Sequence, residues 1–301
     1  MSIVSIPFLC AAGTDVGQKR EHNEDAFVFD AEHGFFMVVD GMGGHEKGEV
    51  AARIAAETIQ NGIRKIENSP EIRLRDSIIL ANNAIYERAR KDSSDMGCVL
   101  TALLVENDSV TVGHIGDTRL YKIRDGKINR ITNDHSLVGM LEEEGELSEK
   151  RLLEHPRRNE VTRCVGFEEK SLESEDFVEI YQTDFEADAA FLLCSDGLSD
   201  LLTTAQIFQV IEENADSPQI IVEKLLAKAN ESGGKDNITV IFIAGKDFAE
   251  ITLKQKNAPT SSRKIVGFIL NPWAFLIYGI LLGGLIVFLL FRFLFPNTST
   301  P

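Results

Sequence analysis

Four aspartates in this chain stand at the edge of strongly apolar runs, where a carboxylate is costly to remove from water unless a positive charge meets it. Three of them follow such a run and the fourth precedes one: Asp40, Asp117, Asp196 and Asp236. Each has a glycine within two residues, which lets backbone approach a ligand closely. Hard oxygen ligands of this kind are selected by Mg²⁺ and Mn²⁺. The pattern therefore indicates a divalent-cation site, provided that the fold brings the strand ends together.

Carboxylates that converge in this way repel one another unless cations lie between them. Two neighbouring cations are able to orient and activate a water molecule for attack on phosphorus. Taken one at a time, however, each Asp-Gly pair is also typical of a plain turn. The residues alone leave that alternative open.

A charged loop over residues 14–25 supplies complementary charge. Within it, Arg20 is suited to holding phosphate oxygens through two hydrogen bonds, and Glu24 and Asp25 are suited to orienting metal-bound waters. The simpler alternative is a solvated loop in which Arg20 forms an ion pair with Glu24. Spacing alone favours that simpler alternative.

The elements that must position these residues are strand-like runs and paired helices. Strands are expected at 3–12, 26–29, 35–39, 99–105, 109–116, 119–123, 128–131, 177–181, 189–194 and 237–244. Helices are expected in two pairs, at 45–66 with 71–91 and at 204–213 with 217–231. A charged excursion over 133–166, with a short helix around 136–144, is expected to lie over one edge. Strands in hairpin-joined runs and helices in pairs predict an α+β fold with largely antiparallel sheets.

Composition and charge exclude several classes of protein. The 301 residues are 44% hydrophobic, which is enough for a large core, so the chain is not disordered. The formal net charge of −16 is concentrated in residues 1–245, because residues 246–301 carry six lysines and arginines against two acids. Such an acidic body repels nucleic acid and anionic lipid. The four cysteines include no Cys-x-x-Cys pair and are expected to be reduced and structural, in a cytosolic domain.

The chain is expected to divide into four parts: a folded domain (1–245), a polar linker (246–264), a transmembrane segment (265–295) and a short tail (296–301). The membrane assignment depends on residues 265–291, which contain no charged residue. The last 20 of these, Pro272 to Phe291, would cross the roughly 30 Å hydrocarbon layer at about 1.5 Å each. More basic residues precede the segment than follow it, which predicts a single-pass C-terminal anchor with the large domain in the cytoplasm.

Five segments occur in the order found in a known family: Arg20–Asp25, Asp40–His45, Gly116–Arg119, Ser195–Gly197 and Gly234–Asn237. On these segments the chain resembles the PP2C-type (PPM family) metal-dependent protein serine/threonine phosphatases, in their bacterial form. Residues 155–159 and 161–163 also resemble the part of that subfamily that follows its flap. The resemblance covers about residues 5–245 and does not extend to the predicted membrane segment.

The resemblance implies an αββα sandwich, in which two antiparallel sheets are flanked by helix pairs. It also implies a centre of two Mn²⁺ or Mg²⁺ ions. Asp40 would bridge the two ions, and the Gly41 carbonyl would join the first. Asp196 and Asp236 would bind the second ion.

Further roles follow from the same resemblance. Asp117 resembles the ligand of a third, weaker ion, and Arg20 matches the phosphate-binding arginine. The implied reaction is direct attack by a metal-activated water on phosphoserine or phosphothreonine, without a phosphoenzyme. Met42 stands where animal-type members have a histidine proposed as general acid, so the leaving-group proton would come from elsewhere. The histidines are expected to be structural: His45 near a helix start, His114 in the core, and His22, His135 and His155 in loops.

The predicted function is therefore a membrane-tethered protein phosphatase in signalling, acting on phosphoproteins made by a cognate serine/threonine kinase. Two alternatives stand beside it: a catalytically weak scaffold that binds phosphoproteins, and a hydrolase of small phosphoesters. The complete set of acidic ligands together with Arg20 favours an active enzyme over a scaffold. The excursion at 133–166 resembles a flap used for protein substrates, which disfavours small phosphoesters.

Overall fold

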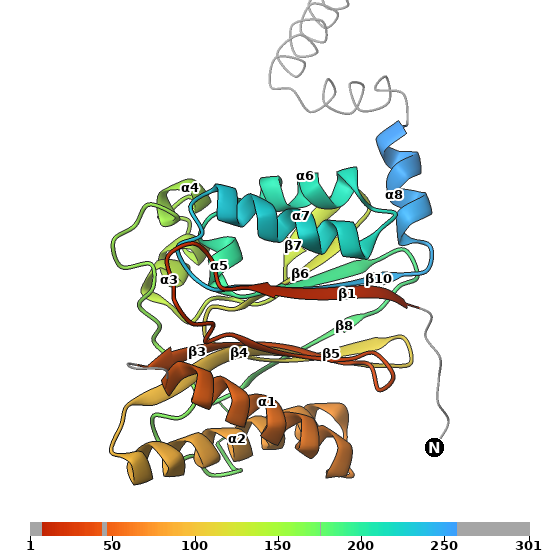
Figure 1. Cartoon of the computed structure of the whole chain (residues 1–301). Coiled ribbons are helices and arrows are strands. Elements are labelled where there is room, and N and C mark those ends of the chain that lie inside the picture. The colour runs from red at the N-terminus through yellow and green to blue at the C-terminus, as the bar shows by residue number, and fades with distance from the viewer. Residues whose placement is uncertain (1–7, 44–46, 175, 258–301) are drawn as a thin grey trace, which may run out of the picture. The chain divides into compact units, whose positions relative to one another are not determined.

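Two antiparallel five-stranded sheets form the centre of the computed structural model, which describes residues 8–43, 47–174 and 176–257 (Figure 1). The first sheet has the order β1 (Phe8–Asp15), β10 (Ile238–Gly245), β9 (Ala190–Cys194), β6 (Arg119–Arg124) and β7 (Lys127–Arg130). The second has the order β2 (Ala26–Asp30), β3 (Phe35–Gly43), β4 (Met96–Glu106), β5 (Ser109–Ile115) and β8 (Glu179–Asp184). Every neighbouring pair is antiparallel, as the sequence predicts.

Helix pairs cover the outer faces of both sheets (Figure 1). The pair α1 (Lys47–Lys65) and α2 (Pro70–Asp92) packs on the second sheet, and the pair α6 (Thr204–Glu213) and α7 (Pro218–Glu231) covers the first. Shorter helices are α3 (Leu137–Glu143), α4 (Glu149–Leu152) and α5 (Asp196–Ser199), and α8 (Phe248–Asn257) follows the last strand. The predicted sandwich of two antiparallel sheets with flanking helices is therefore confirmed.

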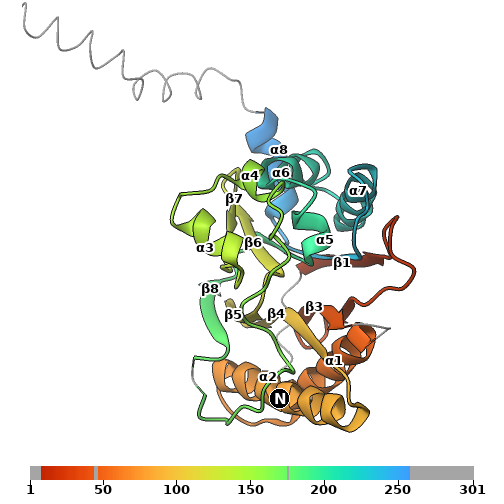
Figure 2. The same cartoon turned by 90° about the vertical axis from the view of Figure 1, so that its left-hand side faces the viewer.

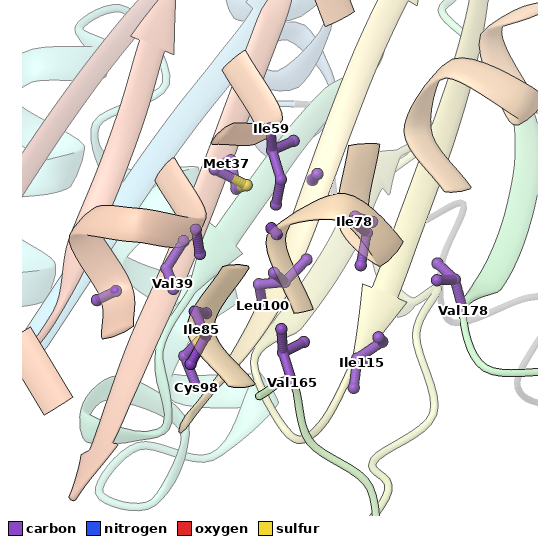
Figure 3. Close-up of a cluster of buried hydrophobic side chains, with 14 of the residues drawn as sticks. Met37, Val39, Ile59, Ile78, Ile85, Cys98, Leu100, Ile115, Val165 and Val178 are labelled. Carbon is purple, nitrogen blue, oxygen red and sulfur yellow. The ribbon is translucent and has the colours of Figure 1, made fainter. Parts of the chain in front are cut away.

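The inner strands are apolar on both faces because each sheet is covered on both sides. Along β3, Met37 and Val39 pack toward α1 and α2, as Figure 3 shows, whereas Phe36 and Val38 pack into the layer between the sheets. A strand buried on both faces gives a continuous apolar run and not an alternating one. This explains why the run at Phe35 is so conspicuous in the sequence.

The long helices begin where local chemistry favours a start. Pro70 and Pro218 occupy the first turns of α2 and α7, where a missing N–H costs nothing. Before α6, Thr203 and Gln206 form a reciprocal capping box, which satisfies two backbone donors. These signals explain why the sequence places these helices within about one residue of their observed limits.

Some elements differ from the sequence prediction. Strand β3 continues beyond residue 39 to Gly43, because β4 begins early enough to pair with it. The stretch expected to be a linker begins with helix α8, whose Phe248 is buried against Phe242 with ring centroids 5.9 Å apart. An aromatic anchor thus extends the folded unit past residue 245, and the compact unit ends at Lys256.

The predicted membrane localisation is corrected by the structure. None of the helices in residues 8–257 is long and apolar enough to cross a membrane. The predicted transmembrane segment (265–295) and tail (296–301) lie outside the described residues. A transmembrane span requires an unbroken apolar helix of about 20 residues, and the described part of the chain contains none.

His114 of β5 lies in the core, as predicted, and is hydrogen bonded at both ring nitrogens. Its Nε2 is 2.9 Å from the carbonyl oxygen of Asn133, so this nitrogen carries the proton, and its Nδ1 is 2.9 Å from Oγ1 of Thr101. Burial, and then the nearby His135, lower the pKa of His114 to about 4. The ring is therefore neutral in the folded protein, and it joins two strands to the base of the 133–166 excursion.

Because folded His114 resists protonation, we expect the free energy of unfolding to fall as the pH drops from 6.5 towards 4. In this range the unfolded chain binds a proton at His114 and the folded chain does not, which costs up to about 1.4 kcal/mol per pH unit. Urea unfolding of the wild type and of His114→Gln at a series of pH values measures this slope. The variant should show a shallower fall; equal slopes would contradict the assignment.

Candidate active site

Asp40 and Gly41 lie inside β3, at the end of the second sheet, where backbones approach closely. Gly41 N–H donates a 3.2 Å hydrogen bond to the Glu24 carbonyl. A Cβ atom at Gly41 would lie 2.3 Å from the carbonyl oxygen of Gly48 and 2.5 Å from that of Glu24. Only glycine fits this position, so packing requires a glycine directly after Asp40.

The other acidic residues reach the same region from strand ends. Asp196 opens α5 directly after β9, and Asp236 stands just before β10, which is the sheet neighbour of β9. Because these two strands are antiparallel neighbours, the end of β9 and the start of β10 lie at the same end of the first sheet. Asp117 follows β5 of the second sheet.

Five carboxylates lie close enough to act on one another electrostatically, and we call them the carboxylate cluster: Asp25, Asp40, Asp117, Asp196 and Asp236. Burial raises the pKa of Asp40 well above its usual value, and the charges of all four other members raise it further. Burial and neighbouring carboxylates likewise raise the pKa of Asp196 well above its usual value. Like charges act this way only at short range. The convergence that the sequence left open is therefore present.

Asp25 is held by two hydroxyl groups of the first sheet. Its Oδ2 accepts hydrogen bonds from Ser195 Oγ at 2.8 Å and from Thr239 Oγ1 at 2.6 Å. Burial raises the pKa of Asp25 to about 6, although both hydrogen bonds favour the charged form. The carboxylate is thus fixed in orientation between the two sheets.

Asn237 ties the charged loop to the first sheet. Its Nδ2 donates to the carbonyl oxygens of Val16 and His22, both at 2.9 Å, and its Oδ1 accepts from the backbone N–H of Glu24 at 2.8 Å. Three backbone groups spread over nine residues are therefore satisfied by one side chain. This anchor determines where Arg20 and Glu24 lie.

Arg20 pairs with a member of the carboxylate cluster and not with Glu24. Its Nη2 donates to Asp236 Oδ2 at 2.7 Å, and 46% of its side chain is exposed. The ion pair expected from spacing alone is therefore replaced by a contact across 216 positions of sequence. Burial raises the pKa of Glu24, which the Gly48 backbone and then Arg20 partly oppose.

Asp117 sits in a loop that is clamped by the start of the 133–166 excursion. His135 and Gly116 exchange two hydrogen bonds: His135 N–H donates to Gly116 O at 2.7 Å, and Gly116 N–H donates to His135 Nδ1 at 3.0 Å. Two residues on, Arg119 makes a buried ion pair with Asp134 through hydrogen bonds of 3.0 Å from Nε. Burial, and then Asp134, raise the pKa of Asp117 to about 7.

The cluster fits divalent cations. Asp196 Oδ1 is buried and has no hydrogen-bond partner among the described residues, so it is free to ligate a cation. In the same part of the chain no three acidic, histidine or cysteine side chains already surround a single point. An ion of the Mg²⁺ type keeps several waters and takes one or two carboxylates, so it does not require three such side chains around one point.

The structure thus gathers the predicted acidic residues, with Arg20 and Glu24 beside them, and leaves His45 outside the described residues. Met42 lies farther along β3, opposite Gly97. Sequence reasoning missed the anchoring role of Asn237, the hydroxyl donors Ser195 and Thr239, and Asp200, whose charge raises the pKa of Asp196 after burial. The only available signal was that these residues directly flank or closely follow the predicted ligands.

Comparisons with known proteins agree with this geometry. A family model described as Protein phosphatase 2C matches residues 12–227. The serine/threonine phosphatase stp of Listeria monocytogenes is 34% identical over 243 residues, which are 76% of this chain and 93% of that protein.

Solved structures agree as well. The Mycobacterium tuberculosis serine/threonine phosphatase PstP/Ppp superposes with a TM-score of 0.71 at 29% identity, covering 79% of this chain and 99% of that one. The catalytic domain of the serine/threonine protein phosphatase PstP in complex with two manganese ions superposes with a TM-score of 0.69 at 28% identity, covering 79% and 97%.

Fold, site and relatives agree on a metal-dependent protein serine/threonine phosphatase that uses Mn²⁺ or Mg²⁺. The chain belongs to the protein phosphatase 2C (PPM) family.

All four cysteines are free, as the sequence predicts.

We expect Asn237→Ala to lower the free energy of unfolding by about 1–3 kcal/mol, because it removes the hydrogen bonds that Asn237 donates to the carbonyls of Val16 and His22. It should also speed hydrogen exchange at the Glu24 amide, which loses its acceptor. Urea unfolding and amide exchange measure these effects. The control is Asn129→Ala, at an exposed position on β7, which should change neither quantity. Unchanged Glu24 exchange in the Asn237 variant would refute the anchoring role.

Proposed function

We propose that the carboxylate cluster is the catalytic centre and that it hydrolyses phosphoserine and phosphothreonine on proteins. The observation that carries this proposal is the convergence of five carboxylates, in which burial and then the charges of the other four raise the pKa of Asp40. When all members of such a site are charged, the carboxylates repel one another, and divalent cations bound between them offset this repulsion. A scaffold that only binds phosphoproteins has no need of such a cluster.

We propose Asp40, the Gly41 carbonyl, Asp196 and Asp236 as ligands of two ions, and Asp117 as the ligand of a third, weaker one. When bound, the ions would supply an activated water and would offset the negative charge of the phosphoryl group. Support comes from the orphaned Oδ1 of Asp196 and from the manganese complex of PstP. The neighbouring Asp200 stays engaged with Arg158, whose Nε donates to it at 2.7 Å.

The remaining residues would act on substrate and water. Arg20 is partly exposed and already hydrogen bonded to Asp236, so its remaining donors are available for phosphate oxygens beside the cluster. Asp25 is held by Ser195 and Thr239 and would accept a hydrogen bond from the attacking water, with Glu24 beside it. Met42 has no acidic proton, so the leaving oxygen would be protonated by water or by another side chain.

We further propose that the substrates are proteins phosphorylated by a cognate serine/threonine kinase. The segment around α3 and α4 supports a protein substrate, because it projects beside β6 and β7 of the first sheet (Figure 2). Its base is joined to the Asp117 loop by the hydrogen bonds of His135. A hydrolase of small phosphoesters would not require this projecting segment around α3 and α4.

We expect Asp40→Asn to lower kcat/KM by about a hundredfold or more, because it removes a carboxylate that would hold the ions. The measurement is phosphate release from a phosphothreonine peptide by the full chain, with Mn²⁺ and with EDTA. Mn²⁺ should also raise the melting temperature of the wild type, and this rise should be reduced in the variant.

The matched control for this experiment is Asp108→Asn, at an exposed turn between β4 and β5. It should behave like the wild type in both measurements. Equal rates with Mn²⁺ and EDTA, or an Asp40→Asn protein as fast as the wild type, would contradict the metal mechanism.

A further inference from the structure

A groove lies beside the carboxylate cluster, along the chain that connects α4 to β8. Figure 2 shows this connection running from the level of the first sheet, past β4, down to α2. The groove has a volume of about 680 Å³, and the residues that line it include Arg163, Phe167, Lys170, Glu173, Asp176 and Phe177. We call it the 162–177 groove. None of these residues has a part in the proposed hydrolysis.

The groove begins next to the proposed metal ligands. Cys98 of β4 pairs with Gly41 on one side, and on the other it exchanges backbone hydrogen bonds of 3.0 and 2.8 Å with Val165. Because neighbouring strands lie about 4.8 Å apart, the backbone of Val165 is roughly 10 Å from Gly41. An extended peptide spans that distance with about three residues. A substrate segment that leaves the catalytic site therefore needs only about three residues to reach Val165, whose neighbour Cys164 lines the groove.

One wall of the groove is held rigidly by α2. Asn82 accepts a hydrogen bond from Gly166 N–H and donates to the Glu168 carbonyl, at 2.8 and 2.7 Å. The next residue, Asn83, bonds to both the N–H and the carbonyl of Lys170, at 2.9 and 2.8 Å. Val165 is buried in the core beside Cys98 (Figure 3). A wall fixed in advance loses little entropy when a ligand binds.

The apolar feature of the groove is Phe167. Phe167 is 51% exposed. Its ring is nevertheless held in place, because it lies against Gly97: a Cβ atom at Gly97 would come within 2.3 Å of the ring. Gly97 is the strand partner of Met42, two residues beyond Asp40. An exposed, rigid aromatic ring of this kind is a typical anchor for a peptide side chain.

The charges of the groove are partly neutralised among themselves. Lys170 is 2.9 Å from Glu168 and lies over the Phe177 ring, 5.3 Å from its centroid. Glu173 and Asp176 form no ion pair in the described part of the chain, and both are exposed. The groove therefore offers two uncommitted carboxylates beside an aromatic ring.

We propose that the 162–177 groove binds the residues that flank the phosphorylated residue of a protein substrate, and that it selects basic side chains. An apolar side chain of the substrate would pack on Phe167, and arginine or lysine would pair with Glu173 and Asp176. The proposal depends on the proposed function, since it requires the phosphorylated residue to sit at the carboxylate cluster. The acidic body of the protein favours the same class of substrate through long-range attraction.

The test compares phosphothreonine peptides of equal length that carry arginine or glutamate, before or after the phosphorylated residue. Phosphate release by the full chain with Mn²⁺ gives kcat/KM for each peptide, and hydrolysis of p-nitrophenyl phosphate reports the catalytic centre alone. We expect the wild type to prefer arginine on at least one side. The double variant Glu173→Gln/Asp176→Asn should lower kcat/KM for that peptide about three- to tenfold, as two exposed ion pairs would.

The matched control is Glu169→Gln, at an exposed acidic residue of the same loop that does not line the groove; it should keep the preference. Phe167→Ala should lower kcat/KM for the peptides and leave p-nitrophenyl phosphate unaffected.

An equal rate for arginine and glutamate peptides, or a preference that survives the double variant, would overturn the groove proposal. So would a loss of p-nitrophenyl phosphate hydrolysis in the double variant, because the carboxylates would then act on the catalytic centre. If Phe167→Ala changed the oligomeric state and not the peptide rates, the groove would be a contact between copies of this chain. Failure of the proposed function is seen separately, as p-nitrophenyl phosphate hydrolysis that does not require Mn²⁺.

Discussion

Mutual repulsion among buried carboxylates is the constraint on which this structure depends. Asp40 is affected by the charges of four other aspartates, and its own burial makes its charge more expensive still. The chain itself supplies only partial relief, through Arg20 on Asp236 and the hydroxyl donors on Asp25. The remaining stabilisation is left to divalent cations. Repulsion among the carboxylates favours the binding of metal ions, and bound metal ions in turn favour the binding of phosphate.

The rest of the fold holds that repulsive arrangement in place. The two sheets are each covered on both faces, so the strand ends that carry Asp40, Asp196 and Asp236 cannot relax apart without opening a core. The loops between them are tied down by polar side chains, as Asn237 shows on one side and His135 on the other. Apolar packing sets the positions, and hydrogen bonds set the orientations.

Particular residues show how far the sequence reaches. The runs around Phe35, Ala190 and Ile238 predicted strands, and the aspartates beside them predicted a cation site, because strand patterns and Asp-Gly turns are local signals. The partner of Arg20 was not predictable in this way. Glu24 is four residues away and Asp236 is 216 away, and only the adjacency of β1 and β10 brings the second one closer. Helix α8 was missed because a single buried aromatic, Phe248, anchors an otherwise polar stretch.

By itself the sequence determined most of the elements, the antiparallel sandwich and the identity of the acidic residues, since these follow from periodicity, turn chemistry and the resemblance of five short segments. The tertiary structure decided what depends on contacts between distant residues: the convergence of the aspartates, the role of Asn237, and the groove that α2 holds beside Gly41. It also corrected the membrane localisation, for which hydropathy alone was insufficient. Local patterns record which residues prefer burial or a turn, whereas the partner of a charge is set by the path of the whole chain.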